Sequence, residues 1–313
     1  MAICEKNGRP LDLSVVIVTY NRGSTLLRTL ASVLAQSPPA GEVIVVDQTR
    51  DHEPNVRQQL ADWSENGAIR LLLQEIPNAQ RARNHAIAEA TFGVLLFLDD
   101  DVILEPGMMA AHLINYSARD IHAVAGFYTE PTDQGTDKLG TAVWWRPLTK
   151  LQLVPASYTG RVNSPLWPSC NGSIRREVIL GLGGFDENYK YTLLDDTDLA
   201  IRLLRAGYRC VHDPEARLAH LKEPTGGARP VKPGSQVIAN REMWFTWCYF
   251  FWSNFGILGL GELAHRLRTC VFRRPYFARP KLLMIACSEA YLGLKMGVQA
   301  IRSGRMLFPK ELA

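Results

Sequence analysis

The sequence is poor in cysteine, and the few cysteines that it has do not form recognisable pairs. Six cysteines are spread over 313 residues, with no C-x-x-C pair and no spacing typical of a metal site. Isolated thiols of this kind are typical of a reducing compartment, which argues against a disulfide framework. The first ten residues also lack the apolar stretch that a signal peptide needs. Together these absences predict a cytoplasmic protein without disulfides.

A basic stripe is missing from the part of the chain that carries the expected strands. The formal net charge is +4, but the residues from Ala264 onward hold ten cations against two acids, a net charge of +8, which leaves −4 for the rest. A mildly acidic body does not suit a phosphate backbone, so we expect no nucleic-acid partner. The basic C-terminal part suits an anionic membrane surface better.

What remains is the composition of an ordinary folded protein, with 47% hydrophobic and 21% charged residues. A chain of this length can hold one large domain, or one domain and an appendage. The composition changes near Ser235, which favours the second arrangement. We expect a body over residues 11–230 and a helical, basic region over residues 235–313.

The most informative stretch is an apolar run at residues 94–98 that ends in three carboxylates, Asp99, Asp100 and Asp101. An unbroken apolar run of this length predicts a strand that is buried on both faces. Three like charges at its end raise one another's pKa and need a cation among them. Oxygen ligands with no cysteine nearby in the sequence favour Mg²⁺ or Mn²⁺ over zinc.

These acids have an alternative interpretation, as a solvated turn that caps the next helix. Pro106 argues against it, because proline favours the first helical position and would make Glu105 the cap. Asp99 and Asp101 would then have no capping role.

Apolar runs at residues 13–20, 42–47 and 69–73 alternate with helical patterns at residues 24–34, 56–63 and 78–90. Ser24 and Asn78 are the expected caps of the first and third helices. Alternation at these lengths predicts an α/β fold with a mostly parallel sheet flanked by helices. Ligands of such sheets bind at the carboxyl ends of the strands, where Asn21, Asp47 and Asp99 should meet.

Two features leave alternatives open. Arg81 and Arg83 cannot share one helix face, so either both are solvated or one contacts a phosphate near the helix start. Trp144, Trp145 and Trp167 either stack on a sugar ring or, more commonly for tryptophan, cover the core.

A second acidic cluster, Asp195, Asp196 and Asp198, stands at the head of an expected helix. Acids are favoured at a helix start by the dipole and by capping alone. Three acids in four positions exceed what a cap requires, and a carboxylate beside an ion-bound substrate can take a proton from an attacking hydroxyl. His220, further along the chain, is either structural or a third metal ligand.

In their order along the chain, these motifs resemble those of the family 2 glycosyltransferases, which are inverting enzymes of the GT-A fold. The resemblance covers about residues 13–221. It rests on Val-Val-Ile-Val-Thr-Tyr-Asn-Arg, the strand that ends at Asp47, Ala82-Arg83-Asn84, the D-x-D motif Asp99-Asp100-Asp101, the turn Gly183-Gly184-Phe185-Asp186-Glu187 and the acidic helix start. It implies a Rossmann-like sheet, a nucleotide-diphosphate sugar as donor and Mg²⁺ or Mn²⁺ as cofactor.

The resemblance also implies roles for individual residues. The nucleotide would be contacted by Thr19, Tyr20, Asn21, Asp47 and Arg83, and its ribose by Asp99. Asp101 would bind the metal, and His220 stands where many relatives have a metal-binding histidine. Asp196 would be the catalytic base. The family usually has Glu-Asp-x-Asp at this helix start, and Asp195 replaces the glutamate here, which makes Asp195 the second candidate.

The implied reaction is a single displacement that inverts the anomeric carbon without a covalent intermediate. A sugar nucleotidyltransferase is one rival, but it would need a glycine-rich loop where Thr19-Tyr20-Asn21-Arg22-Gly23 stands. A catalytically silent nucleotide-binding relative is another, against which the intact Asp99, Asp101 and Asp196 count.

The C-terminal region opens with an apolar, aromatic stretch at residues 243–261 that nearly reaches the length of a membrane span. Its three glycines and many aromatics favour an interfacial or core helix over a span. A second helix is expected over residues 278–301. With the charge of +8, this predicts a protein held at the inner face of the cell membrane, with a lipid-linked or polysaccharide acceptor of envelope or exopolysaccharide synthesis.

Overall fold

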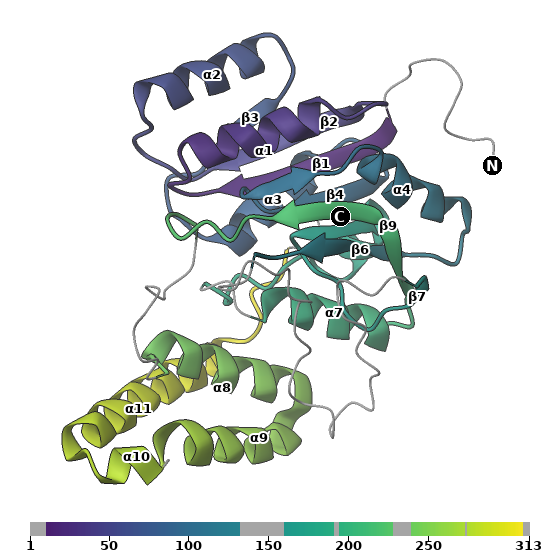
Figure 1. Ribbon diagram of the computed structural model, residues 1–313. Helices are drawn as coiled ribbons and strands as arrows, with labels where there is room; N and C mark the ends of the chain where they lie inside the picture. The colour runs from purple at the N-terminus through teal and green to yellow at the C-terminus, as the bar shows by residue number, and fades with distance from the viewer. Residues whose placement is uncertain (1–10, 132–159, 191–193, 228–238, 273, 309–313) are drawn as a thin grey trace.

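The computed structural model describes residues 11–131, 160–190, 194–227, 239–272 and 274–308. A central sheet with helices against it forms the upper part of the molecule, and a separate group of helices lies below it (Figure 1). The expected boundary at residues 230–235 falls outside the described residues, as do Trp144 and Trp145.

The first half of the sheet consists of four parallel strands in the order β3-β2-β1-β4. The strands are β1 (Leu11–Thr19), β2 (Ala40–Asp47), β3 (Arg70–Leu73) and β4 (Val94–Leu98), and they alternate with α1 (Ser24–Leu34), α2 (Pro54–Glu65) and α3 (Ala79–Glu89). The alternation and the parallel pairing predicted for this part are confirmed.

Alternate side chains of these strands enter two different cores, which explains their unbroken apolar runs. On β1, Val16 packs with α3 residues such as Ala86, whereas Val15 and Ile17 pack with α1 residues such as Leu30. All five residues of β4 are buried. The carboxyl end of β4 is therefore held from both faces of the sheet.

The second half of the sheet is mixed. Its strands are β5 (Val102–Leu104), β6 (Ala123–Thr129), β7 (Val162–Asn163), β8 (Asn171–Arg175) and β9 (Cys210–His220). The order continues β4-β8-β6-β9-β5, with β7 also on β9. Only the β6–β9 pairing is parallel here; β8 runs antiparallel to both β4 and β6. The predicted sheet flanked by helices is confirmed, and antiparallel strands extend its far side.

Strand β8 is a polar stretch for which the apolar pattern of the sequence predicts no strand. Its polar residues do not give the apolar pattern of a buried strand, yet Asn171 and Ser173 are fully buried. His112 contacts both, with Nε2 2.8 Å from Asn171 Oδ1 and Nδ1 2.9 Å from Ser173 Oγ. A buried strand can carry polar side chains when each has such a partner. The short helix α6 (Arg176–Gly181) follows directly.

Two helix starts differ from the prediction. Helix α4 (Met108–Ile114), which continues into a turn of 3₁₀ helix, η1 (Asn115–Ser117), has Gly107 rather than Glu105 as its N-cap. Gly107 has a φ of 79°, a backbone conformation that glycine adopts easily. The chain is extended in β5 up to Leu104 and turns at Gly107 before the helix begins. Ser24 is the first residue of α1 rather than its cap, which is Gly23. Asn78 does cap α3, since its side chain accepts hydrogen bonds from the amides of Gln80 and Arg81.

The C-terminal region is helical, as predicted. After α7 (Asp195–Arg205) and β9, the chain forms α8 (Arg241–Phe255), η2 (Gly256–Leu258), α9 (Gly259–Arg266), the π-helical turn η3 (Leu267–Val271), α10 (Arg274–Phe277) and α11 (Pro280–Ser303). Helices α8 and α11 lie side by side below the sheet (Figure 1).

The expected single helix over residues 243–261 is divided: residues up to Phe255 lie in α8, which forms the core of this region, whereas Ile257, Leu258 and Leu260 lie beyond it and are exposed. Trp244, Tyr249 and Phe250 of α8 are fully buried. Gly293 lets α11 approach closely, because a Cβ there would lie 2.4 Å from Trp244 Cβ. Within the described ranges, no helix has both the length and the apolar character to cross a membrane.

Candidate active site

The predicted meeting of polar residues at the strand ends is borne out by the pairing. Thr19, the last residue of β1, stands opposite Asp47, the last residue of β2, and the acids follow β4 on the other side of β1. Tyr20 and Asn21 continue from β1 into a loop, where Asn21 has a φ of 53°. The backbone amide of Asn21 donates to Thr49 Oγ1 at 2.9 Å. The carboxyl ends of β1 and β2 and the loops that follow them thus form one polar surface, called here the ledge.

Asp47 is buried and fixed by two partners. Its Oδ1 accepts from the amide of Thr49 at 2.9 Å, and its Oδ2 lies 2.5 Å from His52 Nε2. His52 was not singled out from the sequence, because a lone histidine in a loop carries no distinguishing pattern. It covers the carboxylate that was predicted to contact the nucleotide.

The D-x-D acids have a cation among them, and it is Arg22. Its Nε donates to Asp100 Oδ1 at 2.7 Å, and its Nη2 lies 3.2 Å from Asp101 Oδ2. Burial raises the pKa of Asp100 to about 6 although Arg22 opposes the shift. The sequence argument assigned this charge balance to a metal alone. Arg22 was missed because it lies 78 residues from Asp100 along the chain.

Arg22 also ties the acids to the segment after β9. Its Nη1 donates to the carbonyls of Glu223 and Thr225, at 3.1 and 2.6 Å. The amide of Gly227 donates to Tyr20 O at 2.7 Å, and a Cβ on Gly226 would lie 2.3 Å from Asn21 O. Residues 223–227 are therefore packed onto the loop at the end of β1.

His220, the last residue of β9, reaches the D-x-D acids from the opposite side. Its Nε2 lies 3.1 Å from Asp101 Oδ1 and 3.6 Å from Asp99 Oδ2. Burial lowers the pKa of His220, but hydrogen bonds with Asp101, Cys170 and Glu130 raise it to about 12. The acids on both sides of the imidazole thus favour its protonated form.

The residues present fit a divalent metal ion. Ligand atoms of Asp99, Cys170 and His220 all lie within 4.8 Å of one another, and Asp101 adjoins His220. The two carboxylates are ligands that Mn²⁺ and Mg²⁺ prefer, whereas the imidazole and the thiol are softer ligands. The expectation that no cysteine lies near the acids is wrong, because the buried Cys170 directly precedes β8, which pairs with β4.

Arg83 answers the question left open for the two arginines of α3. Arg81 is exposed and pairs with Glu187, whereas Arg83 is buried in the site. The Nη1 atom of Arg83 lies 2.8 Å from Asp195 Oδ2, and its Nη2 lies 3.8 Å from Asp99 Oδ1. Arg83 therefore links the acids after β4 to the acids of α7.

The three acids of α7 have three different environments. Asp195 pairs with Arg83, and Asp198 is fully buried against Arg202 and Arg305. Burial, and secondly the charge of Asp195, raise the pKa of Asp196 to about 7. Leu194 is the N-cap and makes no side-chain cap hydrogen bond, whereas Asp196 Oδ1 accepts from the amide of Thr197 at 2.7 Å in the first turn.

Trp167 belongs to the core. Its ring packs edge-on against Phe97 of β4, with centroids 5.5 Å apart, and its Nε1 donates to Ser173 O at 2.8 Å. This is the commoner of the two alternatives considered for the tryptophans.

Comparison with known proteins gives a family for this architecture. The model of "Glycosyl transferase family 2" matches residues 14–178. The chain is 24% identical over 239 residues to a putative polypeptide N-acetylgalactosaminyltransferase 10 of Drosophila melanogaster, which covers 71% of this chain and 37% of that protein. It is 28% identical over 220 residues to an O-antigen biosynthesis protein of Myxococcus xanthus, which covers 66% of this chain and 17% of that protein. The chain thus spans well under half the length of these two relatives.

A solved structure supports the same fold. The crystal structure of GalNAc-T7 with UDP, GalNAc and Mn²⁺ superposes with a TM-score of 0.59 at 18% identity, over 82% of this chain and 54% of that one. The family model matches more than half of the chain, and the superposition agrees with the α/β architecture described above. The chain belongs to glycosyl transferase family 2.

Proposed function

We propose that this protein is a metal-dependent, inverting glycosyltransferase that moves a sugar from a nucleotide-diphosphate sugar to a hydroxyl group. One observation carries the proposal: Arg83 contacts both Asp195 of α7 and Asp99 of the D-x-D motif. The residues predicted for donor and metal binding thus lie beside the residues predicted for proton transfer. A reaction between a metal-bound diphosphate sugar and a hydroxyl needs this adjacency.

The donor would lie along the ledge at the strand ends. Thr19, Tyr20, Asn21, Asp47, Arg83 and Asp99 are the proposed contacts to the nucleotide. Asp101 and His220 are the proposed metal ligands, with Asp99 beside them. A divalent ion bound there supplies positive charge for the diphosphate that leaves. GalNAc-T7, the structural neighbour, was solved with UDP and Mn²⁺, which supports this assignment by analogy of fold.

Asp196 is the better candidate for the base, and Asp195 the weaker one. Asp195 accepts a charge-assisted hydrogen bond from Arg83 at 2.8 Å, so its carboxylate is already engaged within the site. Asp196 has a raised pKa near the operating range of a general base. It would take the proton of the acceptor hydroxyl while that oxygen attacks the anomeric carbon from the face opposite the diphosphate. The leaving bond breaks as the new bond forms, so the configuration inverts.

A panel of nucleotide sugars and nucleoside diphosphates tests the donor assignment. We expect one nucleotide base to raise the melting temperature of the protein when Mn²⁺ is present and to have little effect after chelation. Matched measurements on Asp51→Asn, whose side chain is 95% exposed, serve as the control. Equal shifts for all nucleotides without metal would contradict the proposal. A silent relative would bind the nucleotide but release no sugar.

We further propose that the acceptor is lipid-linked or a polysaccharide and is met at a membrane surface. The relative from Myxococcus xanthus is named for O-antigen biosynthesis, which supports a glycan acceptor. The helical region adds a surface argument. Large apolar side chains stand out from it, with exposed fractions of 76% for Ile257, 66% for Leu258, 60% for Phe277 and 72% for Met284.

The exposed charged residues of the helical region over residues 256–272 and 274–308 are positive. Its exposed cations are Arg268, Arg274, Arg279, Lys281, Lys295 and Arg302. Within residues 256–272 and 274–308, both acids are half-buried and paired, Glu262 with Arg266 and Glu289 with Arg241. Arg266 and Arg305, which contribute to the charge of +8, are half-buried in ion pairs and do not belong to the exposed set. Exposed cations beside apolar side chains suit an anionic lipid surface at the cytoplasmic face.

A further inference from the structure

The segment after α11 returns from the helical region to the catalytic body. The chain turns at Gly304, whose φ is 80°, and runs along the turn that contains Gly183 and Asp186. The amide of Met306 donates to Asp186 Oδ1 at 3.1 Å, and the amide of Phe308 donates to Gly183 O at 2.7 Å. Residues 304–308, called here the return segment, are therefore bonded to the body by their backbone.

Arg305 of the return segment enters a buried acidic site beside α7. Its Nη1 lies 2.8 and 3.0 Å from the two carboxylate oxygens of Asp198 and 3.3 Å from Asp186 Oδ2. Its Nη2 donates to Ser253 O and to Asn254 Oδ1, both at 3.2 Å. One guanidinium thus joins the body, α7 and the end of α8.

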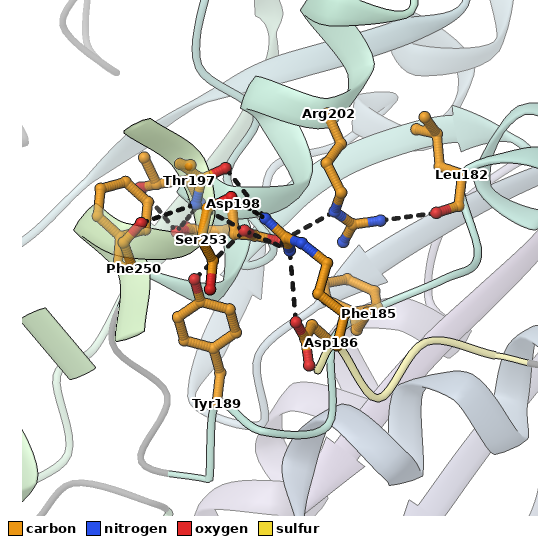
Figure 2. Close-up of polar contacts among 12 residues, drawn as sticks. Leu182, Phe185, Asp186, Tyr189, Thr197, Asp198, Arg202, Phe250 and Ser253 are labelled. Carbon is orange, nitrogen blue, oxygen red and sulfur yellow. Dashed lines mark hydrogen bonds and ion pairs between the residues drawn. The ribbon is translucent and has the colours of Figure 1, made fainter. Parts of the chain in front are cut away.

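The same site holds the first turn of α7 from several other sides. Asp186, Asp198 and Arg202 converge there with Tyr189 and Ser253 (Figure 2). Arg202 Nε donates to Asp198 Oδ2 at 2.9 Å, and Tyr189 donates to Asp198 Oδ1 at 3.2 Å. Two carboxylates, both with fully buried side chains, meet two guanidinium groups, so the charge is balanced only while Arg305 is present.

Asp198 lies two residues after Asp196 in the first turn of this helix. The N-cap of α7 is Leu194, which has a left-handed φ of 66° and makes no side-chain cap hydrogen bond. The helix start is held at Asp198 and, through Arg83, at Asp195, and Asp196 Oδ1 accepts a hydrogen bond from the amide of Thr197. Any shift at Asp198 moves Asp196 with it, because both belong to one helical turn.

We propose that Arg305 is a positioning residue for transfer: through Asp198 it fixes α7, and so Asp196, against the donor site. This inference rests on the proposed function. It assigns to the C-terminal region a part in turnover that is separate from membrane contact. It also explains why an arginine from a basic tail turns inward instead of joining the exposed cations.

Arg305→Lys in the full-length protein is the main test, because it keeps the charge and loses the fork that reaches two acids at once. We expect Mn²⁺-dependent affinity for the nucleoside diphosphate to stay within about twofold and kcat to fall by about tenfold or more, since small misplacements of reacting groups can cost up to about 10²-fold. Amides of residues 195–205 should exchange hydrogen faster. Arg119→Lys, at an exposed position of the catalytic body, is the matched control and should change none of these.

The double variant Arg305→Met with Asp186→Asn removes one charge of each sign. It leaves no additional unpaired buried carboxylate, so a loss of activity would not simply reflect unfolding. It should remain folded, bind the diphosphate and transfer slowly. Unchanged kcat in both variants would overturn the inference. Loss of diphosphate affinity together with kcat would also overturn it, because the network would then support the whole body rather than α7. If the unaltered protein itself showed no metal-dependent diphosphate binding, the proposed function would fail instead, and the exchange of residues 195–205 would still report on Arg305.

Discussion

At the scale of single residues, the site is organised by arginines as much as by acids. Arg22 forms ion pairs with Asp100 and Asp101, and Arg83 joins Asp99 to Asp195. These cations hold like charges together at the strand ends before any metal binds. They also leave Asp196 as the acid of α7 with a raised pKa.

The metal assignment predicts the effect of Asp101→Asn. The change removes a carboxylate that lies 3.1 Å from His220 Nε2, and it keeps the shape of the side chain. We expect Mn²⁺-dependent binding of the nucleoside diphosphate to be lost by calorimetry, while the circular dichroism spectrum stays unchanged. Asp51→Asn should bind as the unaltered protein does. Undiminished metal-dependent binding by Asp101→Asn would move the metal site away from the end of β4.

The assignment of the base predicts a pH dependence. A base must be ionised to accept a proton, and burial together with Asp195 raises the pKa of Asp196 to about 7. We therefore expect kcat to rise with pH, to reach half its limit near pH 7, and to fall about tenfold per unit well below it. Asp196→Asn should retain donor affinity, lose transfer by about a hundredfold or more, and lose this acidic limb. A variant with near-normal turnover would transfer the role to Asp195.

Some residues of this site can be predicted from the sequence, and others cannot. Asp47 and Asp99 could be placed because each ends an apolar run, and strand ends meet at one edge of a parallel sheet. Arg22, His52 and Cys170 could not. Arg22 contacts residues up to 203 positions away, and Cys170 reaches Asp99 only because β8 pairs with β4. Such contacts depend on tertiary packing that no local pattern records.

At the scale of elements, hydrophobic periodicity predicts the parallel half of the sheet and the helices of the C-terminal region. It fails at β8, where buried Asn171 and Ser173 are satisfied by His112 on α4. The preference of proline for the first helical position also misplaces the start of α4, whose N-cap is Gly107 and not Glu105. Both misses arise where tertiary partners or backbone shape override side-chain polarity.

The contact of α11 with α8 predicts opposite outcomes for two glycine substitutions. In Gly293→Ala the new Cβ would meet Arg241 O and Trp244 Cβ at 2.4 Å, so we expect a loss of about 1–3 kcal/mol in the free energy of unfolding. In Gly261→Ala of α9 the Cβ would meet nothing within 4 Å, so the helix propensity of alanine should add up to about 1 kcal/mol. Urea unfolding measures both. Equal effects would mean that α11 does not pack on α8 in this way.

At the scale of the whole molecule, the sheet carries the proposed site, and the helical region lies below it as a separate group of helices (Figure 1). The two parts are linked by the return segment and by the ion pairs of Arg305. The proposed membrane contact and the proposed catalytic edge would therefore belong to one connected body, which suits a lipid-linked acceptor.

Flotation with liposomes tests the membrane surface. We expect the protein to float with vesicles that contain anionic lipid, more weakly at high salt, because each well-placed cation contributes about 1 kcal/mol. The triple change Ile257→Ser, Leu258→Ser and Phe277→Ser should abolish flotation. Leu73→Ser, which removes an equally exposed apolar side chain from β3, should not. A protein that stays in the soluble fraction at low salt would make the helical region a cover for the catalytic body alone.

The most direct test of the central claim is the configuration of the sugar that the protein releases. Nucleotide sugars are slowly hydrolysed when water replaces the acceptor, and proton NMR resolves the first anomer formed before mutarotation. With Mn²⁺ and the nucleotide sugar that binds best, we predict the anomer opposite to that of the donor, and no release after chelation or in Asp196→Asn. Release of the same anomer, or equal release without metal, would contradict the proposed single displacement at Asp99, Asp101 and Asp196.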